Sequence, residues 1–108
     1  MSSEKNRRII NLLGICIRAG KVVKGFDSAV EAAKNGTAVC LLTASDASPK
    51  TVKEVRYYCE KYAVRHFEAD ISKFDVGRLC GKETAVIAVT DKGFADGFEK
   101  IIANDKIF

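Results

Sequence analysis

The chain has 108 residues, of which 47% are hydrophobic and 30% are charged. This composition is typical of one globular domain, here residues 1–108, and it excludes a disordered chain. No apolar run approaches the roughly 18 residues that span a bilayer, and the charged start does not resemble a signal peptide. We therefore expect a cytoplasmic protein that makes no membrane contact.

The net charge of +4 lies entirely in the first third of the chain. Residues 1–36 hold seven of the 18 basic residues and three of the 14 acidic ones, so residues 37–108 hold 11 of each and sum to zero. Such an asymmetry is typical of a surface for an acidic partner, most simply nucleic acid. A solvated basic helix is the alternative, and composition leaves both open.

The spacing of apolar residues and the positions of glycines predict the first helices and strands. Apolar residues recur at helical spacing over residues 4–18, and Gly20 ends this predicted helix. A short β-prone segment follows at residues 21–23. Gly25 then opens a second helix over residues 26–35. The run at residues 38–44 is almost wholly apolar, which predicts a strand covered on both faces.

The second half continues the alternation. Ser48 and Pro49 begin a third helix, a strand follows at residues 64–68, and Ser72 caps a short helix that Gly81 ends. Residues 85–89 form a second apolar strand, and Asp91 caps the last helix. Five helices alternating with four strands predict a three-layer α/β/α sandwich.

Catalytic and metal-binding patterns are missing from the sequence. The single histidine, His66, has no evident acid partner, and there is no phosphate-binding or dinucleotide-binding glycine motif. The four cysteines are scattered without metal-ligand spacing, which favours buried free thiols over a disulfide or a metal set; they are Cys16, Cys40, Cys59 and Cys80. We expect no catalytic residue, no cofactor and no metal.

Tyr57 and Tyr58 lie near Arg56 and Lys61 in the third predicted helix. Interleaved aromatic and basic residues can stack RNA bases. Consecutive residues of a helix do not share a face, however. We therefore interpret the tyrosines as the boundary between core and surface.

The segment at residues 18–28 places Arg18, Lys21 and Lys24 around a glycine-bounded turn before a helix N-terminus. Exposed N–H groups and a partial positive charge at such an end favour phosphate. The alternative is that Gly25 and Asp27 simply begin the helix. The segment alone does not decide between the two.

Four stretches in order resemble one known family. They are residues 13–25 (LGICIRAGKVVKG), 38–49 (AVCLLTASDASP), 76–82 (VGRLCGK) and 91–95 (DKGFA). They are similar to the ribosomal kink-turn-binding proteins, the L-seven-Ae and L-thirty-e group, and to its YlxQ-type bacterial branch. The resemblance covers about residues 7–103 and implies an α/β/α sandwich with a four-stranded mixed sheet.

The resemblance also implies RNA binding by two loops. One leads into the second helix, where the family has a Gly-x-Asn-Glu motif and a lysine; the other precedes the last strand and covers an extruded base. With the preceding turn, they give the candidate RNA-binding residues Arg18, Lys21, Lys24, Gly25, Phe26, Asp27, Ser28, Glu31, Lys82, Glu83, Thr84, Ala85 and Val86.

This chain departs from the family at the first loop. Asp27 and Ser28 stand where the family has Asn-Glu, and Glu31 stands where it has the lysine. A carboxylate near phosphates repels them, and Asp27 cannot donate as an asparagine does. The second loop also lacks the apolar pair of strong binders. We therefore expect a structured-RNA or ribosome-associated protein with relaxed kink-turn specificity, working as a monomer. The alternative hypothesis is a protein-interaction module that has lost RNA recognition.

Overall fold

Helices and strands alternate strictly through residues 3–103, the part of the chain that the computed structural model describes. This order confirms the predicted one. The elements are α1 (Glu4–Arg18), β1 (Val22–Lys24), α2 (Phe26–Lys34), β2 (Cys40–Thr43), α3 (Pro49–Lys61), β3 (Arg65–Glu68), α4 (Lys73–Cys80), β4 (Val86–Val89) and α5 (Lys92–Ala103).

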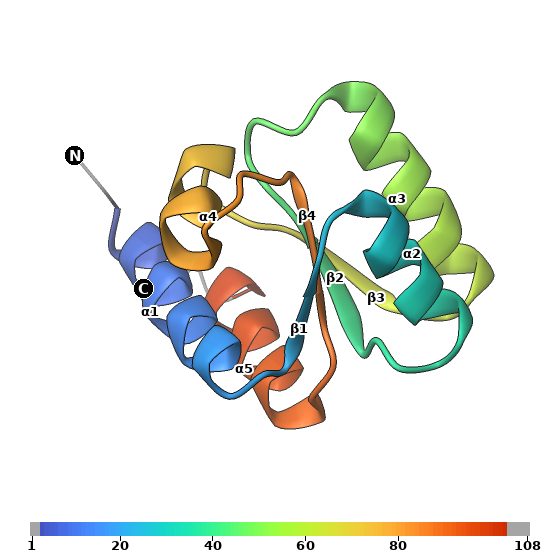
Figure 1. The fold of residues 1–108 in the computed structure, drawn as a ribbon, viewed down its shortest axis with the longest axis horizontal. Coiled ribbons are helices and arrows are strands. Elements are labelled where there is room, and N and C mark those ends of the chain that lie inside the picture. The colour runs from blue at the N-terminus through green and yellow to red at the C-terminus, as the bar shows by residue number, and fades with distance from the viewer. Residues whose placement is uncertain (1–2, 104–108) are drawn as a thin grey trace.

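The four strands form one mixed sheet in the order β1-β4-β2-β3 (Figure 1). β2 and β3 are parallel, whereas β4 is antiparallel to both of its neighbours, β1 and β2. In the β1–β4 pair, Val22 faces Val89 and Lys24 faces Ile87. This pairing places the end of β1 beside the beginning of β4, although about 60 residues separate them in the sequence.

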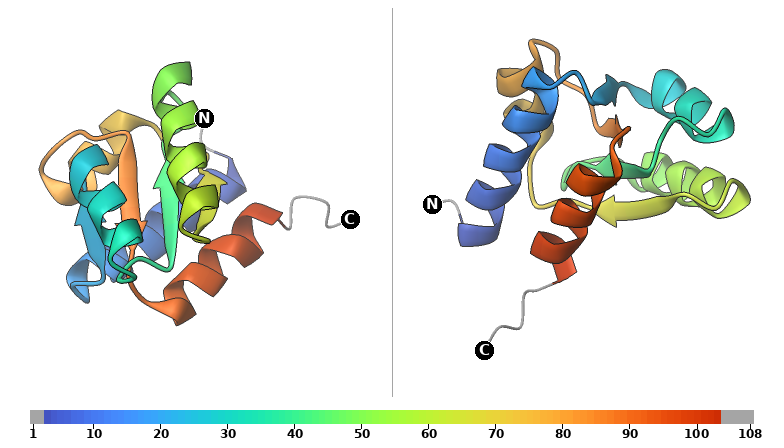
Figure 2. Two further views of the ribbon diagram at one scale, coloured as in Figure 1. Left: turned by 90° about the vertical axis from the view of Figure 1, so that its right-hand side faces the viewer. Right: turned by 90° about the horizontal axis from the view of Figure 1, so that it is seen from below.

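Helices cover both faces of the sheet, as Figure 2 shows. α1, α4 and α5 lie on one face and pack on side chains that include Leu42 and Ile87. α2 and α3 lie on the other face and pack on Leu41 and Ala88. Successive strand residues point to opposite faces of a sheet, so the two central strands supply both cores. The predicted three-layer α/β/α sandwich is confirmed.

The predicted start and stop residues are in place. The Ser48 hydroxyl accepts from the Thr51 N–H at the start of α3, and Ser72 caps α4 in the same way. The Asp91 carboxylate accepts from the Phe94 N–H at the start of α5. No helix within residues 3–103 is both long and apolar enough to cross a bilayer.

The four cysteines are free thiols, which confirms that prediction. Three are buried and Cys80 is half-buried. Burial raises the pKa of Cys16 and Cys40 to about 12 and that of Cys59 to about 11. The thiols therefore act as small apolar side chains in the core.

Candidate functional site

Two connections that the sequence separates meet at one end of the sheet. The Gly25 N–H donates to the Val86 carbonyl oxygen at 2.9 Å, and the Lys24 Nζ lies 3.5 Å from the Cys80 carbonyl oxygen. Figure 1 shows the start of α2 and the α4–β4 connection at this end. We call residues 24–28 and 81–85 together the two-loop face.

The start of α2 is open. Gly25 has φ +100°, a conformation that L side chains rarely adopt, so glycine is required there. Gly25 provides no capping side chain, whereas serine side chains cap α1, α3 and α4. The first N–H groups of α2 after Gly25 are consequently left to solvent or to a ligand with acceptor oxygens.

Two lysines lie on the two-loop face with their charges uncompensated. Lys24 and Lys82 are both exposed, and within residues 3–103 neither forms an ion pair. Lys24 reaches the C-terminus of α4, where the carbonyl groups favour a cation. The two-loop face therefore places two cations near the open N–H groups, together with the exposed carboxylates of Asp27 and Glu83.

Acidic side chains lie along α2, beginning within the two-loop face. Asp27 and Glu31 are one helical turn apart, and both are exposed. With Ser28 and Asn35 they line a hollow of about 380 Å³ that runs along β1. Both carboxylates would repel a phosphate in this hollow. This repulsion was expected, because Asp27 and Glu31 differ from the residues that the family has at these two positions.

Lys21 does not lie beside Lys24, although both were expected around one turn. The Lys21 carbonyl oxygen accepts from the Thr90 N–H, beyond the end of β4, whereas Gly25 pairs with Val86 at its beginning. The whole length of β1 separates the two lysines, about 10 Å at strand rise. A three-residue strand therefore divides the predicted basic segment between opposite ends of the sheet.

The α4–β4 connection is held against α4. A Cβ added at Gly77 would lie 2.7 Å from the Glu83 Cγ and 3.3 Å from its backbone N, so glycine permits this close approach. The predicted loop ends at Ala85, because Val86 belongs to β4 and its side chain is only 1% exposed. Val86 adjoins the two-loop face through its carbonyl oxygen, which accepts from the Gly25 N–H, while its side chain is buried.

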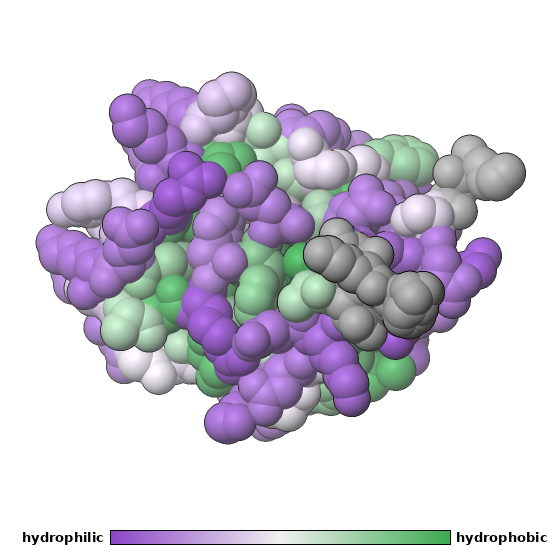
Figure 3. Space-filling model, turned by 180° about the vertical axis from the view of Figure 1, so that it is seen from behind, coloured by the Kyte–Doolittle hydropathy of each residue, from purple (hydrophilic) through white to green (hydrophobic). Residues whose placement is uncertain are grey.

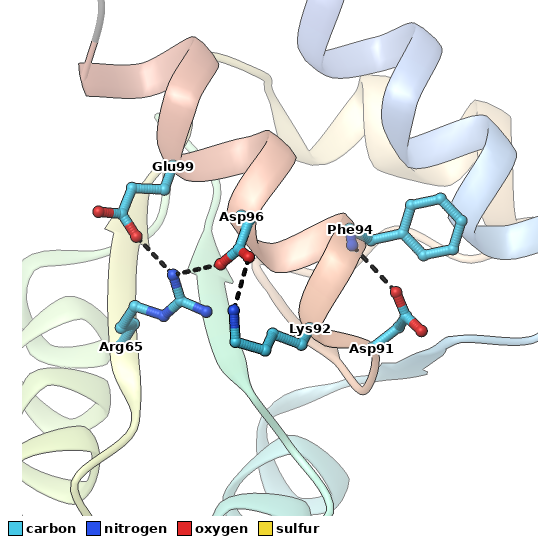
Figure 4. Close-up of polar contacts among 6 residues, drawn as sticks. All are labelled: Arg65, Asp91, Lys92, Phe94, Asp96 and Glu99. Atoms are coloured by element: carbon cyan, nitrogen blue, oxygen red, sulfur yellow. Dashed lines mark hydrogen bonds and ion pairs between the residues drawn. The ribbon is translucent and has the colours of Figure 1, made fainter.

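His66 and the charged groups that join β3 to α5 have structural partners. His66 Nε2 lies 3.0 Å from the Thr43 hydroxyl, and burial lowers the pKa of the imidazole. Arg65 of β3 pairs with Asp96 and Glu99 of α5 (Figure 4), and Lys92 and then Arg65 lower the pKa of Asp96. Among residues 3–103, no group of three His, Cys, Asp or Glu side chains is placed to hold a metal ion.

The tyrosines of α3 mark the edge of the core, which confirms that interpretation. Tyr58 and Tyr62 are half-buried and stacked, with ring centroids 6.4 Å apart. Tyr57 is 56% exposed. The Lys61 Nζ lies 5.9 Å from the Tyr57 ring centroid and therefore covers part of this surface.

The fold and the paired loops define a class of small α/β/α sandwich domains. Within that class, the chain belongs to the ribosomal protein L7Ae/L30e/S12e/Gadd45 family, whose model matches residues 8–98. It is 42% identical over 86 residues to the RNA-binding protein YlxQ of Bacillus subtilis, covering 79% of this chain and 85% of the relative. The YlxQ protein of Enterococcus faecium is 30% identical over 102 residues, or 94% of this chain and 98% of the relative.

More distant relatives share the same fold. The large ribosomal subunit protein eL30B of Schizosaccharomyces pombe is 32% identical over 88 residues, covering 78% of this chain and 74% of the relative. A solved protein of unknown function from Bacillus halodurans superposes with a TM-score of 0.80 at 30% identity, over 87% of this chain and 95% of the other. A 15.5kD RNA binding protein of Giardia lamblia superposes with a TM-score of 0.74 at 22% identity, over 96% and 89%. The last comparison shows the fold alone.

Proposed function

We propose that this chain binds structured RNA in a ribosome-related role, through the two-loop face and without a catalytic step. The observation that carries the proposal is the contact of Lys24 and Gly25 with Cys80 and Val86, because it joins both predicted RNA-binding segments into one surface. The names of the YlxQ and eL30 relatives support the same class of ligand. We take the chain to act as a cytoplasmic monomer with a single domain.

The chemistry of the face suits the RNA backbone. Lys24 and Lys82 offer cations to phosphates, and the open start of α2 offers N–H donors. Asp27, within the two-loop face, and Glu31, one turn further along α2, oppose phosphates. Because the cations and N–H donors attract the RNA backbone while the carboxylates repel it, we expect RNA binding with relaxed kink-turn specificity.

A salt titration with matched lysine variants tests the proposal. The probes are two labelled hairpins of equal length, one a kink-turn with sheared G·A pairs and one an uninterrupted duplex. Each phosphate contact makes the affinity fall by about a further threefold between roughly 50 and 200 mM salt. A variant that loses one contact should therefore lose that part of the salt dependence. We expect this loss for Lys24→Ala and a smaller effect for Lys21→Ala, which removes the same charge at the other end of β1.

Two results would contradict the proposal. One is the absence of salt-dependent binding to either hairpin by the wild-type chain. The other is a Lys24→Ala variant that binds both hairpins as tightly as the wild type at every salt concentration. Partners retained from an RNase-treated lysate, combined with the first result, would favour a protein-interaction module instead.

The balance of charge on α2 has its own test. Glu31→Lys replaces the acid by the cation that the family resemblance places there, and the residue is exposed, so the fold should tolerate it. We expect this variant to bind the kink-turn hairpin more tightly while its affinity for the duplex rises less. An equal gain for both probes would show that position 31 does not contribute to specificity.

A further inference from the structure

Most of the positive charge of the chain lies on α1. This helix holds four basic residues and one acidic residue, a net charge of +3 out of +4 for the whole sequence; they are Lys5, Arg7, Arg8, Arg18 and Glu4. The two-loop face adds no net charge, because Asp27 and Glu83 balance its two lysines. RNA binding by that face therefore does not account for the charge of α1.

α1 and α5 pack side by side (Figure 2), and a hollow of about 370 Å³ lies between them. Leu12, Ile15 and Ile101 line this α1–α5 hollow, and Ile15 is 46% exposed. On the side that Figure 3 shows, hydrophilic side chains cover most of the surface, and hydrophobic ones appear only in small patches. An exposed aliphatic patch with a polar border is typical of a protein-interaction surface.

Two cations line the same hollow, one from each helix. Arg8 and Lys100 are both exposed, and within residues 3–103 neither forms an ion pair. Glu4, one turn before Arg8, pairs with Arg7 instead. None of the described residues that line the hollow is acidic. The stems of the two cations extend the apolar lining, while their charged ends stay in solvent.

The acidic side chains of α5 lie on the other side of that helix. Asp96 and Glu99 pair with Arg65 of β3, and Asp96 also pairs with Lys92. Figure 4 shows both carboxylates directed towards β3, with α1 on the opposite side of α5. The charges of α5 are thus separated, and the side that faces the hollow carries the cation Lys100.

We propose that the α1–α5 hollow docks an acidic amphipathic helix of a protein partner. The aliphatic side chains of that helix lie on Leu12, Ile15 and Ile101. Its carboxylates contact Arg8 and Lys100. The groove between two packed helices accepts a third one, and the uncompensated cations determine the sign of its charge. No aromatic ring is among the described lining residues, so the hollow has no platform on which RNA bases could stack.

The size of the hollow determines the kind of complex. On α1 the lining extends from Arg8 to Ile15, which is two helical turns or about 10 Å. A contact of this length is small and belongs to the weak, transient class. The hollow shares no residue with the two-loop face, so the chain should hold RNA and the partner helix at the same time.

The probe is a synthetic helical peptide of about four turns, with leucines along one face and glutamates on both sides of them. Binding to the isotope-labelled chain is followed by NMR, which gives the affinity and the backbone amides whose signals shift. We expect shifts at Leu12, Ile15 and Ile101. Two control peptides should not bind: one has lysine for every glutamate, and one has the same residues shuffled so that the leucines share no face.

Matched variants test the two kinds of contact. Ile15→Ala removes the most exposed aliphatic side chain of the hollow and should lower the affinity for the glutamate peptide about tenfold. Lys100→Glu should lower it by a similar factor and should allow the lysine peptide to bind. Tyr57→Ala and Lys53→Glu make comparable changes at exposed positions of α3, in the opposite layer, and should bind as the wild type does. Thermal denaturation checks that each variant is folded.

Three results would overturn the inference. The wild type could bind no peptide, it could bind the glutamate and lysine peptides equally well, or the shifts could lie outside the hollow. The kink-turn hairpin separates the inference from the proposed function, since Lys100→Glu should bind the hairpin as well as Lys53→Glu does. Weaker hairpin binding by Lys100→Glu, or displacement of the peptide by the hairpin, would assign the hollow to RNA and refute the protein partner. If the wild type binds the peptide but no hairpin, only the proposed function fails.

Discussion

The close contact between Gly77 and Glu83 makes the position of the α4–β4 connection testable. In Gly77→Ala the new Cβ would lie 2.7 Å from the Glu83 Cγ, 3.3 Å from its backbone N and 3.4 Å from its Cα. The first distance is far shorter than van der Waals contact allows, so the side chain must turn away. The backbone distances require a shift of a few tenths of an ångström as well. Alanine at position 77 should therefore displace the connection from α4.

Two opposing effects set the expected stability. Alanine is favoured over glycine inside a helix by roughly 0.5–1 kcal/mol. Overpacking typically costs about 1–3 kcal/mol. We expect a net loss of roughly 0–2.5 kcal/mol in the free energy of unfolding, measured by urea denaturation. The displaced Lys82 should at the same time weaken binding to the kink-turn hairpin several-fold.

Gly97→Ala is the matched control. Gly97 is also a helical glycine, but its new Cβ would meet only the Leu12 Cδ2, at 3.0 Å, in the α1–α5 packing. The end of a leucine side chain moves easily, so this variant should be as stable as the wild type or more so, with unchanged RNA affinity. A Gly77→Ala variant that matches Gly97→Ala in both stability and affinity would refute the proposed role of the Gly77–Glu83 contact.

Three further predictions concern the core. Phe98→Ala removes a fully buried ring between α5 and the sheet and should lower the free energy of unfolding by about 3–5 kcal/mol in urea; a loss below about 1 kcal/mol would contradict this packing. Burial lowers the pKa of His66 in the fold, so the unfolded chain binds the extra proton more readily, and stability should fall as pH drops below about 6.5. His66→Gln should reduce that dependence, and an unchanged pH profile would contradict it. Cys80, the half-buried thiol, should react first with a thiol reagent at mildly alkaline pH, and rapid reaction of several thiols in the folded chain would be inconsistent with the burial of Cys16, Cys40 and Cys59.

Most element boundaries were predictable because local residues determine them. Ser48, Ser72 and Asp91 each hydrogen-bond a backbone N–H within three residues, and a contact this short can be recognised in the sequence. The first strand was predicted one residue too early, and the other three were predicted slightly too long. Residues 38–44 are apolar and mostly buried, but only residues 40–43 form β2. The hydrophobic pattern shows which residues are buried. Burial extends beyond the residues that pair with a neighbouring strand, so the pattern overestimates the strand's length.

The candidate site was predictable only in part, because long-range pairing assembles it. Lys24 and Lys21 are close in sequence, yet β1 separates them. The contact of Gly77 with Glu83 depends on how the connection folds back over α4.

Charge on the two sides of the two-loop face determines how RNA can approach it. Asp27 and Glu31 repel phosphates along β1, whereas Arg78 and Lys82 attract them along α4. All four groups lie at the surface, where interactions act over about 8 Å at physiological ionic strength. Each pair therefore governs mainly its own side. An RNA whose backbone crosses from the start of α2 towards α4 follows the cations and avoids the carboxylates. If the chain binds RNA as proposed, the carboxylates of α2 should keep the RNA backbone on the side of Arg78 and Lys82.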